Sequence, residues 1–329
     1  GIAVLGANIT GGSTGTTRLI GTNASNSNTN RQQGVWLNDA AGVTSLVTST
    51  GGSVTVTGFG GGSSTGTNNF NYGVAVQNGL IASGGTGTVN VTGTGGTTTG
   101  INNAGVAFNG SSLSNGISSS GGVINVTGTG GAGGLSPGVW IVSGLNGSIQ
   151  SGSNAAINLT TASLVMESGA INAGSGTVTI QNRSTGTLID VGGTSADALA
   201  SPLKLGVSSA ELARITAGTV VVGRNDATAS GNVTVNATNM GAMGNTSGNL
   251  TVLSGGLLTV SGAVTTTAGS EANLTLRANK DISVASNTTI STASEPLNVV
   301  MNANLGNAGG GVILNSGAGV TTKGGDITM

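Results

Sequence analysis

The chain has 329 residues, of which 63 are glycine and only 6% are charged, and its formal net charge is −1. Disorder is excluded, because disordered chains combine low hydrophobicity with high net charge, whereas 36% of these residues are hydrophobic. Cysteine and histidine are both absent, which excludes disulfides, thiol catalysis and metal sites built from either residue. The nine basic residues are dispersed, so no nucleic-acid partner is expected. The sequence contains no apolar run of about 18 residues, so no membrane-spanning helix is predicted.

Residues 1–33 are predicted to be a lead-in to the rest of the chain. The short segments 2–5 and 18–20 are strand candidates, and the polar run 22–33 is typical of a surface loop. The sequence opens without a signal peptide and closes within a strand-like phrase, so we expect an internal segment of a longer chain.

Two phrases recur between residues 34 and 163, which we predict to be a block of large coils. The phrase Gly-Val-x-Φ, in which Φ is a large apolar residue, begins at Gly34, Gly73, Gly105 and Gly138. Its last three copies lie 32 and 33 residues apart. The phrase Asn-Val-Thr-Gly-Thr-Gly-Gly occurs at 90–96 and again, 35 residues later, at 125–131. Nearly constant spacing of two phrases predicts one supersecondary unit repeated as a solenoid.

Alternation within the two phrases predicts which side chains are buried. Successive residues of a strand point to opposite faces, so the second and fourth residues of the first phrase are expected to form two core rows: Val35, Val74, Val106 and Val139, and Leu37, Val76, Phe108 and Ile141. The third residue of that phrase faces outward, and it is tryptophan at Trp36 and Trp140. In the second phrase like side chains stacked on successive coils are expected to form an outward ladder of Thr55, Asn90, Asn125 and Asn158.

We therefore predict an all-β parallel β-helix, or β-solenoid, with two or three short strands per coil and roughly 11 to 14 coils. A single coil buries almost nothing, whereas stacking at about 4.8 Å per coil pairs every strand and joins the inward Val, Ile and Leu side chains into continuous rows. The predicted segments are the lead-in 1–33, large coils 34–163, continuing coils 164–190, a helix-containing insertion 191–217 and shorter coils 218–329.

The insertion breaks the strand pattern. Ser208 and Glu211 have the spacing of a capping box, and Leu212 and Ile215 form an apolar pair three residues apart. One short helix that flanks the solenoid is therefore expected near 208–215.

Charged residues are placed unfavourably for catalysis. No residue between Asp39 and Glu167 is charged, and the acids that follow are scattered and mostly close to turns. A β-helical polysaccharide lyase or glycosidase needs carboxylates clustered on one face. The Gly-Gly-x-Gly-x-Asp series of calcium-binding solenoids has only a faint counterpart at 324–326. The sequence predicts no catalytic, metal or cofactor site, and a protein that is not an enzyme.

Three surface features leave other interpretations open. Trp36 and Trp140 are candidate glycan contacts, because exposed tryptophan stacks on sugars, unless a Gly-rich excursion of the chain covers each ring. Asn-x-Ser/Thr triplets could accept glycans, although a chain so rich in these residues produces them by chance. Ice binding needs a flat, regular outward array of threonine, and asparagine interrupts the array at Asn90, Asn125 and Asn158.

The chain resembles a known family in the style of its repeats. The Val-Asn-Val-Thr-Gly-Thr-Gly-Gly phrases, the segment 212–219 and the pair 297–303 and 309–315 are similar to the filamentous haemagglutinin-type exoproteins of Gram-negative bacteria, the β-strand-repeat adhesins of two-partner secretion. The resemblance covers nearly the whole chain. It implies a right-handed β-helical shaft outside the cell. The family's amino-terminal secretion domain carries Asn-Pro motifs, and no Asn-Pro pair occurs here.

Repeat and resemblance together predict a non-enzymatic structural shaft or fibre segment of an extracellular bacterial surface adhesin, which mediates adhesion, aggregation or biofilm formation. Its expected partners are host or neighbouring-cell surfaces or glycans. One alternative is a fibre subunit that stacks head-to-tail through open strand edges, because such edges are templates for pairing. Further alternatives are a glycan- or ice-binding solenoid and a carbohydrate-active β-helix enzyme.

Overall fold

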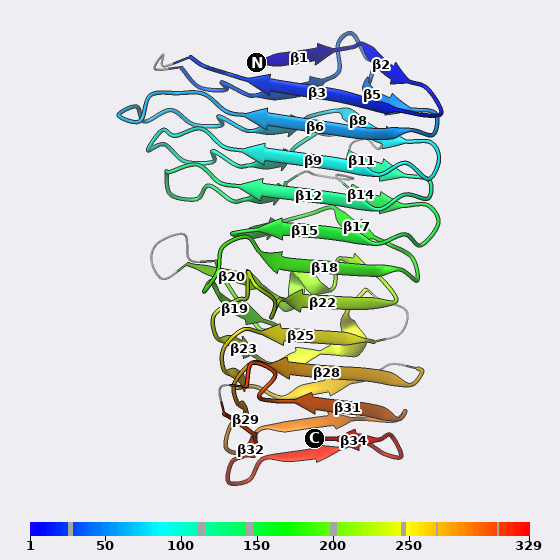
Figure 1. The fold of residues 1–329 in the computed structure, drawn as a ribbon, viewed down its shortest axis with the longest axis vertical. Coiled ribbons are helices and arrows are strands. Elements are labelled where there is room, and N and C mark those ends of the chain that lie inside the picture. Colours follow the sequence, from blue (N-terminus) through cyan, green and yellow to red (C-terminus); the bar gives the residue numbers. More distant parts are fainter. Residues whose placement is uncertain are drawn as a thin grey trace. The chain divides into compact units, whose positions relative to one another are not determined.

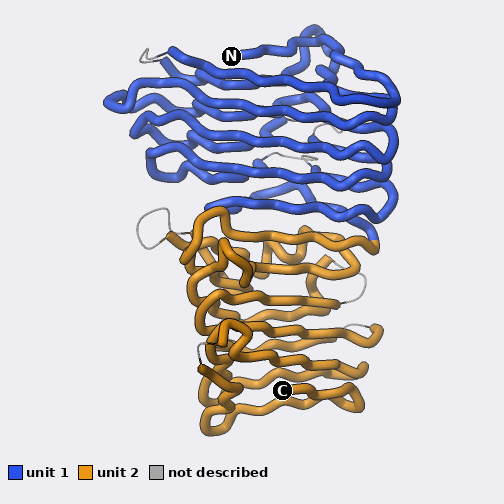
Figure 2. Tube along the Cα trace, viewed as in Figure 1, with its two compact units in different colours: residues 1–174 blue, residues 175–329 orange. Residues whose placement is uncertain are grey.

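The predicted parallel β-helix is confirmed by the computed structural model, which is built almost entirely of parallel strands (Figure 1). The structure describes residues 1–25, 29–110, 116–142, 148–197, 203–244, 248–267, 269–307 and 309–329. Parts of the predicted loop 22–33 and of the predicted insertion 191–217 lie outside this set. The chain divides into two compact units, residues 1–174 and residues 175–329 (Figure 2).

Unit 1, residues 1–174, repeats three strands in the same order, so each strand position builds its own parallel sheet. The first sheet contains β1 (Ile2–Leu5), β4 (Val35–Asn38), β7 (Val74–Val76), β10 (Val106–Phe108), β13 (Val139–Ile141) and β16 (Leu164–Met166). The second contains β2 (Asn8–Gly11), β5 (Ser45–Ser49), β8 (Gly79–Ser83), β11 (Gly116–Ser119), β14 (Ser148–Ser151) and β17 (Ala170–Asn172). The third contains β3 (Thr16–Thr22), β6 (Ser53–Phe59), β9 (Val89–Thr94), β12 (Ile124–Thr129) and β15 (Ile157–Thr161).

The core of unit 1 consists of aliphatic rows that run from coil to coil. Val35, Val74, Val106 and Val139 are register partners on successive strands of the first sheet, and all four are fully buried. The second row, two residues later on each strand, is buried in the same way and contains Leu37, Val76, Phe108 and Ile141. Burying a side chain of this size contributes about 1.5–3 kcal/mol, so the rows provide the main driving force for stacking.

Unit 2, residues 175–329, also builds three parallel sheets. Its long sheet contains β18 (Thr177–Asn182), β22 (Thr219–Gly223), β25 (Leu250–Ser254), β28 (Ala272–Ala278), β31 (Leu297–Asn302) and β34 (Ile327–Thr328). A second contains β20 (Lys204–Val207), β19 (Leu188–Val191), β23 (Val233–Val235), β26 (Leu258–Val260), β29 (Ile282–Val284) and β32 (Val312–Leu314). The third contains β24 (Thr238–Asn239), β27 (Val264–Thr266), β30 (Thr289–Thr292) and β33 (Gly319–Thr321).

The later coils of unit 2 are shorter than those of unit 1, although the coil that contains the insertion, between Thr177 and its partner Thr219, is 42 residues long. Val89 and its register partner Ile124 lie 35 residues apart, whereas Leu274 and its partner Val299 lie 25 apart. In unit 1 the Gly-rich segments 95–105 and 130–138 connect one long strand to the next coil. Within the described residues the third sheet of unit 1 has five strands and the long sheet of unit 2 has six. Each coil contributes one of these strands, so the two units together have 11 coils, the lower end of the predicted range.

The insertion contains the predicted short helix. Helix α1 (Ser209–Leu212) begins with a complete capping box, in which Ser208 and Glu211 each bond to the other's backbone N–H. The helix is shorter than the predicted span, because Ala213 ends it and Ile215 already belongs to β21 (Ile215–Thr216). A second irregular element, the 3-10 turn η1 (Met240–Ala242), follows β24.

Candidate functional site

Outward asparagines form a hydrogen-bonded ladder on the third sheet of unit 1. Asn90, Asn125 and Asn158 are register partners. Asn125 Nδ2 donates to Asn90 Oδ1 at 2.9 Å, and Asn158 Nδ2 donates to Asn125 Oδ1 at 2.9 Å. Thr55 lies one coil earlier in the same column. The ladder makes this face uncharged and polar, with its amides engaged along the stack.

Unit 2 carries a second ladder, which the sequence interpretation missed. Asn273 Nδ2 donates to Asn249 Oδ1 at 2.8 Å, and Asn298 Nδ2 donates to Asn273 Oδ1 at 3.0 Å. The Asn-Leu-Thr phrase at 249–251 and again at 273–275 was the available signal, because the same phrase at 158–160 belongs to the first ladder. Asn298 does not share that phrase, so only the fold places it in the column.

Trp36 and Trp140 lie on the outer face of the first sheet, in one column with Ala75 and Ala107. The side chain of Tyr72, at the end of an excursion, packs in this column and meets the Trp140 ring edge-to-face, with 6.2 Å between ring centroids. The resulting apolar cluster consists of Tyr72, Ala75, Ala104 and Ala107, with Trp36, Phe70 and Trp140 packed against it. Both tryptophans are half-buried, so a sugar would meet only part of each ring.

Polar contacts also hold the two indoles. Trp36 Nε1 donates to Gln77 Oε1, and Trp140 Nε1 donates to Glu167 Oε1 at 3.4 Å. Tyr72 is almost fully buried, and this burial raises the pKa of its hydroxyl. The role of the two tryptophans as glycan contacts stays a prediction.

Two ion pairs are seen among the described residues. Lys204 pairs with Asp190 across β20 and β19 at 2.9 Å, and Arg224 pairs with Asp226 at 2.6 Å. The hydrogen bond from Arg224 lowers the pKa of Asp226. Among the residues whose placement is described, no three Asp or Glu side chains converge to form a metal site. In the same part of the chain, no helix has the length and hydrophobicity needed to cross a membrane.

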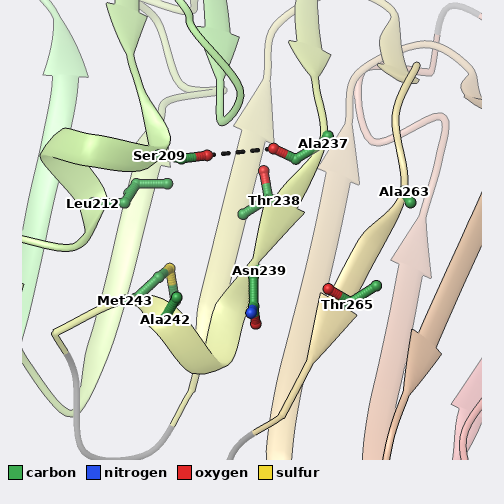
Figure 3. Close-up of a pocket in the computed structure, with 9 residues that line it drawn as sticks. All are labelled: Ser209, Leu212, Ala237, Thr238, Asn239, Ala242, Met243, Ala263 and Thr265. Atoms are coloured by element: carbon green, nitrogen blue, oxygen red, sulfur yellow. Dashed lines mark hydrogen bonds between the residues drawn. The ribbon is translucent and has the colours of Figure 1, made fainter.

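A hollow of about 390 Å³ opens in unit 2 where the repeat is interrupted (Figure 3). Helix α1 forms one wall, strands β24 and β27 form the other side, and η1 closes one end. It is lined by Ser209, Leu212, Ala237, Thr238, Asn239, Ala242, Met243, Ala263 and Thr265. None of these side chains is charged. Sequence reasoning did not find this site, because it needs α1 and η1, which do not repeat, beside the repeating strands β24 and β27.

No family model, curated protein or solved structure matches the chain. The features that bear on function are the stacked coils, the two amide ladders, the apolar cluster with its two partly covered tryptophans, and the hollow lined by uncharged residues.

Proposed function

We propose that this chain is a non-enzymatic structural shaft segment of an extracellular adhesin at the surface of a Gram-negative bacterium, where it contributes to adhesion, aggregation or biofilm formation. The observation that carries the proposal is the in-register stacking of parallel strands in both units. A solenoid of this kind lengthens by adding coils without any change to its core. Such growth suits a spacer that holds a binding surface away from a cell.

The distribution of charge supports a non-enzymatic role. General acid–base catalysis needs titratable groups placed within hydrogen-bond reach of a substrate, and the large coils of residues 40–166 contain no charged residue. Among the acids of unit 2 for which contacts are described, Glu211 belongs to the capping box of α1, and Asp190 and Asp226 pair with basic residues. Three others, Asp197, Glu271 and Asp281, accept hydrogen bonds from Gly206 N–H, Asn298 Nδ2 and Gly311 N–H. These are structural tasks.

The columns of asparagine and threonine support contacts with uncharged partners such as cell-surface glycans, although the ladder of unit 2 also contacts the Glu271 carboxylate. The amide ladders present oxygen and nitrogen atoms in regular columns, and one neighbouring column, of Thr57, Thr92 and Thr127, adds hydroxyl groups. Faces of this chemistry bind by many weak hydrogen bonds and not by charge steering.

The proposal is tested by immunogold electron microscopy on cells that produce the protein, with an antibody against this chain and a strain that lacks the gene as the control. We expect gold particles outside the cell envelope, on projections, and slower sedimentation of cells in the deletion strain because they aggregate less. Label confined to the cell interior would contradict the proposal, as would equal aggregation of both strains. Continuous fibres longer than a single chain would favour the head-to-tail fibre alternative.

A further inference from the structure

The outer face of the third sheet of unit 1 is regular and uncharged over four coils. Its strands β6, β9 and β12 lie side by side, and no other element crosses them in Figure 1. Their outward side chains are half-exposed or exposed and fall into columns that follow the register. We call this surface the ladder face, and it consists of the asparagine ladder with Thr55, the column Thr57, Thr92, Thr127 and Thr160, and the column Phe59, Thr94 and Thr129.

The ladder face retains hydrogen-bond donors and acceptors for a partner. The amide nitrogens of Asn125 and Asn158 each carry two N–H groups, and the ladder uses one of them. In the next column, the hydroxyls of Thr57, Thr92 and Thr127 make no hydrogen bond with the described residues. Because a hydroxyl both donates and accepts, each ladder face can serve as donor and acceptor for an identical one.

One end of the ladder face adds two exposed apolar side chains. Ile20, on β3, is the register partner of Thr57, and Phe59 follows Thr57 by two residues on the same side of β6. Ile20 and Phe59 are therefore diagonal neighbours across one coil step, and they are 47% and 40% exposed. A partner that covers both removes apolar surface from water, which favours association.

The spacing of the ladder face determines which partner matches it. Its groups repeat once per coil, at about 4.8 Å. A partner with another repeat comes into register at only some of the coils, whereas a second copy of the chain has the same repeat along the whole face. Rows of identical side chains from two such sheets can interdigitate tightly. Residues 40–166 carry no charge, so two copies of these coils do not repel each other.

We propose that the ladder face binds the same face of a second copy of this chain, with the two stacking directions antiparallel. Arg18, the register partner of Thr55, sets the orientation. It is the one charged residue among the outward side chains of β3, β6, β9, β12 and β15. A parallel pair would bring the two Arg18 side chains together, which is unfavourable, whereas an antiparallel pair places each against the opposite end of the other copy.

The size of the ladder face predicts a weak contact. Four coils of about five residues cover roughly 300 Å² per copy, which is less than a standard interface buries. Such a contact strengthens when many copies meet at once, as they would between two cell surfaces. The proposal names a partner for this face and does not depend on the location of the chain, so its failure would leave the proposed shaft standing.

Analytical ultracentrifugation of the purified full chain, from about 10 μM to about 1 mM, measures the association. We expect a monomer–dimer equilibrium with a Kd of about 0.1–1 mM, as suits an interface of this size. A chain that stays monomeric at about 1 mM overturns the proposal. A monomeric chain that sediments with insoluble cellulose would also overturn it, and would assign the ladder face to neutral glycans.

Charge variants locate the contact. Thr92 lies in a middle coil of the ladder face, so Thr92→Lys and Thr92→Glu each bring like charges together and should weaken dimerisation by about tenfold or more. An equimolar mixture of the two variants should restore it. Ala132→Lys and Ala132→Glu, at an exposed position outside the ladder face, are the matched controls and should dimerise as the unmodified chain does.

Circular dichroism confirms that each variant folds. Dimerisation that the Thr92 charges leave unchanged, or that the mixture does not restore, contradicts the ladder face as the interface. Arg18→Glu tests the orientation: mixed with the unmodified chain, it should associate no more strongly than the unmodified chain alone. Stronger association of that mixture would show a parallel pair, in which the two residues at position 18 meet.

Discussion

Glycine is required at particular residues where the backbone of another strand lies against the α-carbon. A β-carbon at Gly93 would overlap the carbonyl oxygen of Gly105, the residue before strand β10. Gly58 and Gly128 face the glycines before β7 and β13 in the same way. The Gly93→Ala variant is therefore expected to lower the free energy of unfolding by about 1–3 kcal/mol. Urea unfolding followed by circular dichroism measures the change. Gly134→Ala is the control, because a β-carbon there meets open space, and equal midpoints for the two variants would contradict this explanation.

Tyr72 predicts how the stability of unit 1 depends on alkaline pH. Burial raises the pKa of its hydroxyl above the ordinary value of about 10, so the folded state favours the neutral phenol. The contribution is fully present below about pH 10 and is lost as the pH rises above it, at about 1.4 kcal/mol per pH unit. Tyr72 is the only tyrosine in the sequence, so tyrosinate absorbance reports it directly.

The measurement compares urea midpoints at about pH 9 and about pH 11 for the unmodified chain and for Tyr72→Phe, which has no hydroxyl to ionise. Lysine titration affects both proteins, so the difference between them isolates Tyr72. The unmodified chain should lose more stability over this interval than the variant. The same loss in both proteins would mean that the hydroxyl does not resist ionisation in the fold.

At the residue scale, the alternation of strand residues predicts which side of the sheet a side chain faces, but not which other side chains pack over it. The rule that successive strand residues face opposite sides places Trp36 and Trp140 opposite the buried valines, where the structure has them. It does not reveal that Tyr72 packs in the same column, because Tyr72 reaches Trp140 two coils away. Such a contact depends on the small size of Ala75, in the coil of Tyr72 itself, and of Ala107, in the next coil, and no local pattern records it.

At the element scale, one coil is the unit that can be removed. Deletion of Leu274–Asn298 joins Asn273 to Val299, the register partner of Leu274, so every remaining strand finds an equivalent neighbour and Asn273 takes the place of Asn298 in the ladder. We expect this variant to fold, because the coils of a solenoid contact mainly their neighbours. Circular dichroism and thermal unfolding measure the result. Deletion of Leu274–Ser286 alone shifts the register and is expected to leave an unfolded or aggregated chain; equal behaviour of the two deletions would show that register is unimportant.

The elements that were predictable are those that repeat. The phrases at 34, 73, 105 and 138 predicted the strands of unit 1, because each copy faces the same neighbours and its pattern is reinforced at every coil. The capping box predicted where α1 begins, since that signal is local. The hollow was not predictable. It arises where α1 and η1, which do not repeat, meet β24 and β27, and its walls are brought together by stacking alone.

At the scale of the whole molecule, both units rely on neutral interactions. With 6% charged residues, the chain is held by aliphatic rows, strand pairing and amide ladders, and the two ion pairs seen among the described residues are both partly exposed to solvent. Partly exposed pairs contribute about 1 kcal/mol or less.

Within either unit the bonds between coils lie along the direction of stacking, and this geometry determines the response to tension. Pulling a unit along that direction loads the coils one after another, so they should peel off singly at low force and not rupture together. A released coil of 32 residues, such as Val74–Gly105, frees roughly 110 Å of chain in exchange for one strand spacing. Optical-trap extension should therefore give a series of small steps, whereas a single large rupture would contradict the mechanism. A solenoid with this property lengthens gradually under load and shortens again when the load is removed.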